Sequence, residues 1–318
     1  MESKLISIGE LLIDFIPNEK GKKLKEVNSF LRLAGGAPAN VCACVSMLGK
    51  ESVMLTKVGE DAFGDFLIET LNKVNVNVSH IKRTSLANTA LAFVSIDNQG
   101  ERDFSFYRNP SADLLLDESE IDEAIFLPND VLHFCSVDLV DAPVKKAHYQ
   151  AIAYAHQHQM IVSFDPNLRF PLWKDKVKYR QTILEFIPKA HLLKISDDEL
   201  FFITEKNDIN AAIHSLFQGC VKVIILTKGA QGATVYTRTS EMFIPSIKVK
   251  AVDTTGAGDA FIGAIIYQIL KKKIDVEHLE TQIDEKVVVF AHRVSAHVVT
   301  RFGGIPSMPS LSDISCIL

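Results

Sequence analysis

Apolar and polar positions along the chain alternate between two patterns. Short runs rich in Val, Ile and Phe recur at residues 4–9, 52–59, 130–135, 160–165, 190–196 and 221–227. Between most of these runs, as in residues 142–157, apolar side chains return every three or four positions, which is the spacing of an amphipathic helix. Strands that alternate with helices in this way predict βαβ units around a mainly parallel sheet.

Two stretches interrupt this rhythm and instead alternate apolar and polar residues around turn sequences. Residues 11–33 do so around Asn18 to Gly21, and residues 89–107 around Asn98 to Gly100. We expect hairpins outside the main sheet, inserted at approximately 12–33 and 89–108. The last third of the chain predicts one helix from residue 258 and a second through 276–300, followed by a loop at 301–310. Because no internal repeat or Pro/Gly/Ser linker divides the chain, we expect residues 1–318 to form a single α/β domain.

Composition narrows the classes of protein to which the chain can belong. It has 318 residues, of which 47% are hydrophobic and 23% charged, with a formal net charge of -5. This balance gives no general attraction for nucleic acid or acidic membranes, and no run approaches the roughly 18 apolar residues of a membrane span. The five scattered cysteines indicate buried thiols in a reducing compartment. The sequence therefore predicts a cytoplasmic protein with neither a nucleic-acid nor a membrane partner.

The first segment that indicates a functional site is VDTTGAGDAFIGA, at residues 252–264. Gly256 and Gly258 flank Ala257, so the backbone can approach a ligand without a Cβ in the way. Apolar spacing predicts a helix that begins near Asp259, and the free N–H groups of residues 256–259 would then form an anion site at the positive helix end. Asp259 itself could serve as the helix N-cap or as a functional carboxylate, and the segment alone favours neither.

Two familiar nucleotide-binding motifs do not fit. Gly256 and Gly258 are followed by Asp275 and Glu277, as in a dinucleotide fingerprint, but the third glycine position holds Phe261 and no second strand precedes the acidic residues. The chain also contains no Gly-x4-Gly-Lys-Ser/Thr motif. A Rossmann or P-loop nucleotide site is therefore excluded.

A second glycine segment, LAGGAPANVCACVSMLG at 33–49, also leads from a bend into a predicted helix. Alone it reads as an ordinary junction of loop and helix. Together, AGGAPANV and DTTGAGDAF resemble the two signatures of the PfkB, or ribokinase-like, family of sugar kinases. The segments GELLIDFIP, KVGEDAFG, FYRNPSAD and DPNLRFPLW extend the resemblance over essentially the whole chain and are similar to the fructokinase branch. The resemblance implies a three-layer α/β/α core with a mainly parallel sheet plus a small β lid.

The resemblance also implies roles for individual residues. It makes Asp259 the base that accepts the proton of the attacking sugar hydroxyl, and an ordinary ionised aspartate is basic enough for a loose phosphoryl-transfer transition state. It places the amides of Gly256, Ala257 and Gly258 against the transferring phosphoryl group. The matching sugar-binding positions are Asp14, Gly35, Gly36, Asn40, Arg108 and Arg169. From the residues alone, Asp14 could be a turn carboxylate, Asn40 a buried helix amide, and both arginines surface ion-pair partners.

For ATP, the resemblance points to Thr227, Lys228, Gly229 and Gly232, a segment that could also be a plain hairpin turn. Residues 196–199 fall where many relatives carry Asn-x-x-Glu, so Ser196 replaces the usual asparagine and Glu199 is expected to hold Mg²⁺ through water. Mg²⁺ keeps several waters and prefers oxygen ligands, which fits this set. The resemblance further implies a K⁺ site at Asp253, Thr255, Gly304 and Ser307.

These observations predict an ATP-dependent fructokinase that transfers the γ-phosphate of ATP to the 6-hydroxyl of D-fructose. The alternatives are a kinase for 2-keto-3-deoxygluconate or another sugar, and a non-catalytic sugar-binding regulatory paralogue, against which the intact GAGD sequence counts. We expect a homodimer, because the strands of the lid need cover.

Overall fold

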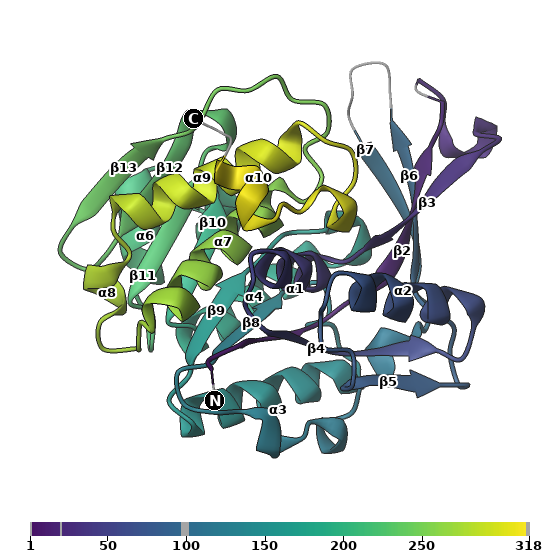
Figure 1. The fold of residues 1–318 in the computed structure, drawn as a ribbon, viewed down its shortest axis with the longest axis horizontal. Helices are drawn as coiled ribbons and strands as arrows, with labels where there is room; N and C mark the ends of the chain where they lie inside the picture. Colours follow the sequence, from purple (N-terminus) through teal and green to yellow (C-terminus); the bar gives the residue numbers. More distant parts are fainter. Residues whose placement is uncertain (1, 20, 97–101, 316–318) are drawn as a thin grey trace.

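A nine-stranded, mainly parallel sheet forms the centre of the computed structural model, which describes residues 2–19, 21–96 and 102–315 (Figure 1). Its strand order is β13-β12-β11-β10-β9-β8-β1-β4-β5. Neighbours from β11 to β5 run parallel, whereas β12 and β13 add an antiparallel edge. The bounds are β1 Leu5–Ile8, β4 Ser52–Gly59, β5 Ile81–Thr84, β8 Val131–Cys135, β9 Ile161–Asp165, β10 Leu192–Ser196, β11 Val223–Thr227, β12 Gly232–Tyr236 and β13 Glu241–Pro245.

Helices cover both faces of this sheet, and each side has its own apolar core. One core packs α1, α2, α7 and α9 against the sheet, and the other packs α3 to α6. Within the described residues no helix combines the length and the apolar character needed to cross a membrane. The helix bounds are α1 Ala37–Met47, α2 Ala62–Lys73, α3 Pro143–Gln157, α4 Lys176–Phe186, α5 Asp197–Thr204, α6 Ile209–Leu216, α7 Ala257–Lys272, α8 Leu279–Gln282, α9 Glu285–Val299 and α10 Leu311–Ser315.

A second, four-stranded sheet stands apart from the first, at the upper right of Figure 1. Its order is β3-β2-β6-β7, with bounds β2 Leu12–Pro17, β3 Phe30–Gly35, β6 Leu91–Ile96 and β7 Arg102–Tyr107. Both hairpins expected from the sequence are present as the antiparallel pairs β2–β3 and β6–β7. The predicted turn at Asn98 to Gly100 lies outside the described residues, as does Lys20 within the turn of the first hairpin.

The predicted mainly parallel core, with helices on both sides and a small second sheet, is thus confirmed. Two elements differ from expectation. The helix expected through 276–300 is two helices, because Asp284 ends the first segment and caps α9 by accepting the N–H of Val287 at 2.9 Å. The strands β5, β12 and β13 were not predicted. Of these, β13 lies at the sheet edge with alternating exposure, which gives it a weaker apolar signal than the buried strands.

Candidate active site

The candidate site lies where parallel strands of the large sheet end. Glu10 and Asn167 lie two residues beyond the ends of β1 and β9, and Ser196 and Thr227 are the last residues of β10 and β11. In open α/β sheets, ligands bind in the crevice outside these strand ends. The glycine segments at 35–36 and 256–258 begin α1 and α7, which pack against each other beside the same edge. Segments far apart in the sequence are therefore gathered at one edge of the sheet.

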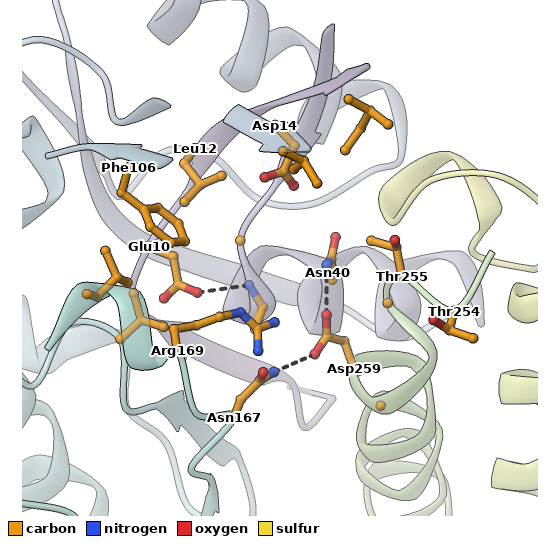
Figure 2. A pocket seen from close by; sticks show the side chains of 18 of the residues that line it. Glu10, Leu12, Asp14, Asn40, Phe106, Asn167, Arg169, Thr254, Thr255 and Asp259 are labelled. Carbon is orange, nitrogen blue, oxygen red and sulfur yellow. Dashed lines mark hydrogen bonds between the residues drawn. The ribbon is translucent and has the colours of Figure 1, made fainter. Parts of the chain in front are cut away.

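A cavity of about 300 Å³ lies between this edge and the small sheet (Figure 2). We call it the sugar cavity, after the ligand that the sequence predicts for it. The small sheet contributes apolar residues and the carboxylate of Asp14, whereas the other polar side chains come from the edge of the large sheet and from the starts of α1 and α7. Among the lining residues are Glu10, Leu12, Asp14, Ile16, Gly36, Asn40, Phe106, Asn167, Arg169, Lys194, Gly258 and Asp259. Of the predicted sugar-binding residues, Asp14, Gly36, Asn40 and Arg169 thus line one cavity together with Asp259.

Two asparagines hold the carboxylate of Asp259 (Figure 2). Asn40 Nδ2 donates to Oδ2 at 2.7 Å, and Asn167 Nδ2 donates to Oδ1 at 2.9 Å. Burial raises the pKa of Asp259, whereas the two amides and the positive charges of Arg169 and Lys194 oppose that shift. The carboxylate is thus fixed in orientation and is more basic than an exposed aspartate.

The start of α7 differs in detail from the prediction. The helix begins at Ala257, and the N-cap is Gly256, whose φ of 76° suits glycine. Asp259 is therefore the third residue of the helix, and its interpretation as the N-cap is wrong. Ala257 N–H donates to Thr254 O at 3.2 Å, so this amide is already engaged within the turn. Gly258 lines two neighbouring cavities.

Two glycines give the sugar cavity its shape. A Cβ added at Gly35 would overlap Oδ2 of Asp14, so glycine leaves room for that carboxylate in its present place. Gly36 has a φ of 108°, and a Cβ there would overlap the carbonyl oxygen of Glu10. Gly35 thus acts on the cavity through Asp14, whereas Gly36 lines it directly.

Arg108 is not among the lining residues of the sugar cavity. Its guanidinium pairs with the buried carboxylates of Asp113 and Asp138, and its own side chain is only 5% exposed. The alternative of a surface ion pair is therefore wrong, since the pair is buried. Arg169 behaves differently: its Nη1 donates to Leu168 O at 3.1 Å, and the guanidinium extends into the cavity between Glu10 and Asp259 (Figure 2).

Glu10 has one carboxylate oxygen bonded and one without a hydrogen-bond partner. Oε1 accepts the N–H of Ala37, at the start of α1, at 3.0 Å, whereas the buried Oε2 has no partner among the described residues. Burial is the main cause that raises the pKa of Glu10 to about 8, and the negative charge of the nearby Asp138 adds to the shift. The carboxyl is therefore largely protonated at neutral pH.

A second cavity of about 610 Å³ adjoins the first. We call it the nucleotide cavity, after the ligand that the sequence predicts for it. It is lined mostly by apolar side chains, with Thr227, Gly229 and Gly232 along one wall. Lys228, in the same segment, is not among the lining residues. The segment is also the antiparallel connection from β11 to β12, with Lys228 N–H donating to Gly232 O at 2.8 Å. The interpretation of the Thr-Lys-Gly sequence as a hairpin turn therefore holds, and three residues of the turn also line the cavity.

The two cavities meet at Thr254 and Gly258, which line both. Gly258 directly precedes Asp259, so the buried carboxylate stands at the junction. A pair of ligands bound in the two cavities would approach each other at this position. The arrangement suits transfer of a group from one ligand to the other.

Ser196 and Glu199 begin α5 with a reciprocal capping box. Ser196 Oγ accepts the N–H of Glu199 at 3.4 Å, and Glu199 Oε2 accepts the N–H of Ser196 at 2.8 Å. Glu199 Oε1 accepts the N–H of Leu168 at 2.8 Å. The glutamate is thus held firmly, and each of its oxygens keeps one lone pair for a further donor.

The two loops predicted to hold a monovalent cation do come together. Asp253 Oδ1 accepts the N–H and the hydroxyl of Thr255 at 2.9 and 2.7 Å, and its Oδ2 accepts the N–H of Gly303 at 3.0 Å. Ser307 Oγ donates to Gly304 O at 2.7 Å. Residues 253–255 and 303–307 therefore form one oxygen-rich corner beside the start of α7.

Several residues of the site were not predicted from the sequence. Asn167, Glu10 and Lys194 line the sugar cavity, and His292 lines the nucleotide cavity while its Nε2 donates to Ile244 O at 3.2 Å. One signal was present: Asn167 and Glu10 lie inside the quoted segments DPNLRFPLW and GELLIDFIP. Lys194 lies within the apolar run at 190–196, which predicts a strand and gives no sign of a functional side chain.

Comparisons of the sequence with known proteins identify the family to which the chain belongs. The sequence model of the pfkB family carbohydrate kinases matches residues 2–311. Fructokinase-2 of Zea mays is 38% identical over 310 residues, covering 97% of this chain and 92% of the relative.

Two crystal structures extend the comparison to the fold. The fructokinase with bound ATP from Xylella fastidiosa has a TM-score of 0.90 and 35% identity, covering 99% of this chain and 98% of that one. A double mutant of the fructokinase from Vibrio cholerae O395, in its fructose, ADP and potassium ion bound form, has a TM-score of 0.89 and 31% identity, covering 100% and 98%. The protein is therefore a member of the pfkB family of carbohydrate kinases.

Proposed function

We propose that this carbohydrate kinase is an ATP-dependent fructokinase that phosphorylates the 6-hydroxyl of D-fructose. The observation that carries the proposal is the position of Asp259, a buried carboxylate at the junction of a polar cavity and a larger apolar one. The substrate follows from the relatives, since those compared above are named fructokinases. The structures with bound ATP, and with bound fructose and ADP, are those of the relatives, and they support the same pair of ligands here.

In this proposal Asp259 is the general base. Asn40 and Asn167 orient its carboxylate, and burial raises its pKa, so it is available to accept the proton of the sugar hydroxyl. The hydroxyl keeps its proton until late in a loose transition state, so modest basicity is sufficient. Asp14, Asn40 and Arg169 would bind sugar hydroxyls in the polar cavity. Arg108 would contribute through the two buried carboxylates with which it pairs.

We propose that the nucleotide cavity receives ATP, with Thr227, Gly229 and Gly232 beside the phosphates and the apolar wall around the base. Mg²⁺ neutralises charge on the phosphates when it is bound. Glu199 fits a role toward it through water, because both of its oxygens are oriented by backbone N–H groups and still have lone pairs. Ser196 would contribute by capping α5 and so fixing this glutamate.

The oxygen-rich corner at residues 253–255 and 303–307 fits a K⁺ ion, since it offers a buried carboxylate and carbonyls and no nitrogen ligand. Asp253 and Thr255 would hold the ion beside the turn that begins α7. Potassium in place of sodium is then expected to raise kcat, and an Asp253→Asn variant is expected to lose this response. Equal activity in both salts would argue against the assignment.

We further propose that the small sheet, at approximately 12–33 and 89–108, is a lid that excludes water from the sugar. Its outer strands β3 and β7 expose Leu31 by 43% and Tyr107 by 63%, which favours cover by a second subunit in a homodimer. Sedimentation of a monomer at micromolar concentration would refute the dimer. The buried free thiols of Cys42, Cys44 and Cys135 favour the reducing cytoplasm.

A sugar panel tests the substrate. Release of ADP is followed with ATP and Mg²⁺ in the presence of fructose, other hexoses or 2-keto-3-deoxygluconate, and the product is identified by NMR. We expect the highest kcat/KM for fructose and a phosphate on the 6-oxygen. A higher kcat/KM with the acidic sugar would assign the chain to that substrate instead, and no turnover with any sugar would favour a regulatory paralogue.

A further inference from the structure

Lys194, on β10, is a buried lysine to which none of the roles above applies. Its Nζ donates to Asp165 Oδ2 at 2.8 Å, and its side chain is 8% exposed. It nevertheless lines the sugar cavity. A charged side chain in such a place needs a partner or a function, because burial of a charge is costly.

We propose that Lys194 is a further catalytic residue, whose ammonium group donates a hydrogen bond to an oxygen of the γ-phosphoryl group during transfer. The inference rests on the proposed kinase function and adds a group that the sequence motifs do not contain. It requires that Nζ lie at the junction of the two cavities, that it keep an N–H to donate, and that it stay charged.

The first requirement is met through Gly258. A Cβ placed on Gly258 would lie 3.1 Å from Lys194 Nζ. Since Gly258 lines both the sugar and the nucleotide cavity, the ammonium lies directly beside the passage between them. Glycine at this position therefore leaves open the space between the ammonium and the start of α7. A larger residue would fill the space that an oxygen of the phosphoryl group needs.

The second and third requirements concern donors and charge. An ammonium has three N–H donors, and Asp165 accepts one of them. Burial alone would lower the pKa of Lys194, but the carboxylates of Asp165, Glu199 and Asp259 raise it above the usual value. The group is therefore a cation at neutral pH with donors left for a ligand.

The chemical step shows where this charge acts. The bond between the γ-phosphorus and the β–γ bridging oxygen breaks, and its electron pair stays with ADP. The sugar 6-oxygen bonds to phosphorus, and its proton passes to Asp259. Negative charge is spread over the three equatorial oxygens of the phosphoryl group, so a fixed cation beside them stabilises the transition state.

A purely structural role is the competing explanation: Lys194 could serve only to neutralise Asp165. Lys194→Met alone would not separate the two, because it leaves Asp165 buried without its partner and could prevent folding. The informative comparison is Asp165→Asn, which keeps the lysine, against Asp165→Asn combined with Lys194→Met, which removes both charges. The exposed Lys206→Met serves as the matched control.

Four proteins are compared: the native protein, Asp165→Asn, the double variant and Lys206→Met. For each we measure steady-state turnover, and also the calorimetric binding of ATP and of ADP in the absence of sugar. Relative to Asp165→Asn, we expect the double variant to lose roughly 10²–10³-fold in kcat. We also expect it to bind ATP more weakly while ADP, which lacks the γ-phosphoryl group, binds equally well. Equal kcat in the two variants, or equal weakening of ATP and ADP, would overturn the proposal. Since the binding comparison needs no sugar, failure of fructose as a substrate would leave this test intact.

Discussion

Removal of the Asn167 amide tests how the site sets the basicity of Asp259. Asn167 Nδ2 donates to Asp259 Oδ1 at 2.9 Å, and the residue itself has a φ of 45°. Alanine would add backbone strain at this φ, whereas glycine accepts it readily. Asn167→Gly therefore removes the amide without forcing the turn to change.

The expected magnitude follows from the bond that is lost. A hydrogen bond to a charged group contributes about 1.5–3 kcal/mol. Loss of the bond makes the ionised carboxylate less stable by about this amount and so raises the pKa of Asp259. The shift adds to the effect of burial, which already raises this pKa, while Asn40 continues to oppose it. Less of the base is then ionised at a given pH below the new value.

The assay is kcat/KM for fructose as a function of pH, for the native protein, Asn167→Gly and the control Asn210→Ala on the exposed side of α6. We expect the acidic limb of the profile to move to higher pH in Asn167→Gly alone. The activity lost near neutral pH should return in part at higher pH. An acidic limb at the native position, with a uniform loss of rate, would show that Asn167 does not tune the base.

Two further predictions concern the walls of the sugar cavity. Gly35→Ala should displace the Asp14 carboxylate, which its Cβ would overlap, and so raise the KM for fructose more than it lowers kcat; a native KM would remove Asp14 from sugar binding. Glu10→Gln should change how stability depends on pH. In the folded protein the pKa of Glu10 is raised to about 8, so the native protein loses stability as pH rises from the unfolded value of about 4.5 through 8, whereas glutamine does not titrate. In urea unfolding, the free energy of unfolding of the variant should therefore rise relative to that of the native protein between pH 6 and pH 9. A difference that does not change with pH would contradict the raised pKa of Glu10.

The parts predicted from the sequence are those encoded in short segments. Six buried parallel strands, the hairpins of the small sheet and both glycine turns each follow from local pattern, and Asp259 lies within one of these motifs. Residues that act through the tertiary fold were harder to predict. Asn167 reaches Asp259 across 92 positions, and Lys194 becomes part of the site only because β10 ends beside the start of α7.

Arg108 shows how the fold adds a partner that a motif does not contain. Its motif resembles a sugar-binding segment, and in the fold its guanidinium pairs with the buried carboxylates of Asp113 and Asp138. Asp113 lies in the same motif, whereas Asp138 lies beyond the end of β8, 30 positions along the chain, and could not be identified from spacing. Likewise, the N-cap at Gly256 depends on a backbone angle that the sequence permits but does not specify.

The most direct test of the account is the turnover of Asp259→Asn with fructose and ATP, measured beside the binding of each ligand. If this carboxylate accepts the proton at the junction of the two cavities, kcat falls by roughly two to four orders of magnitude while both ligands still bind. A variant with near-native kcat would contradict the central claim and leave Asp259 as a structural residue of α7.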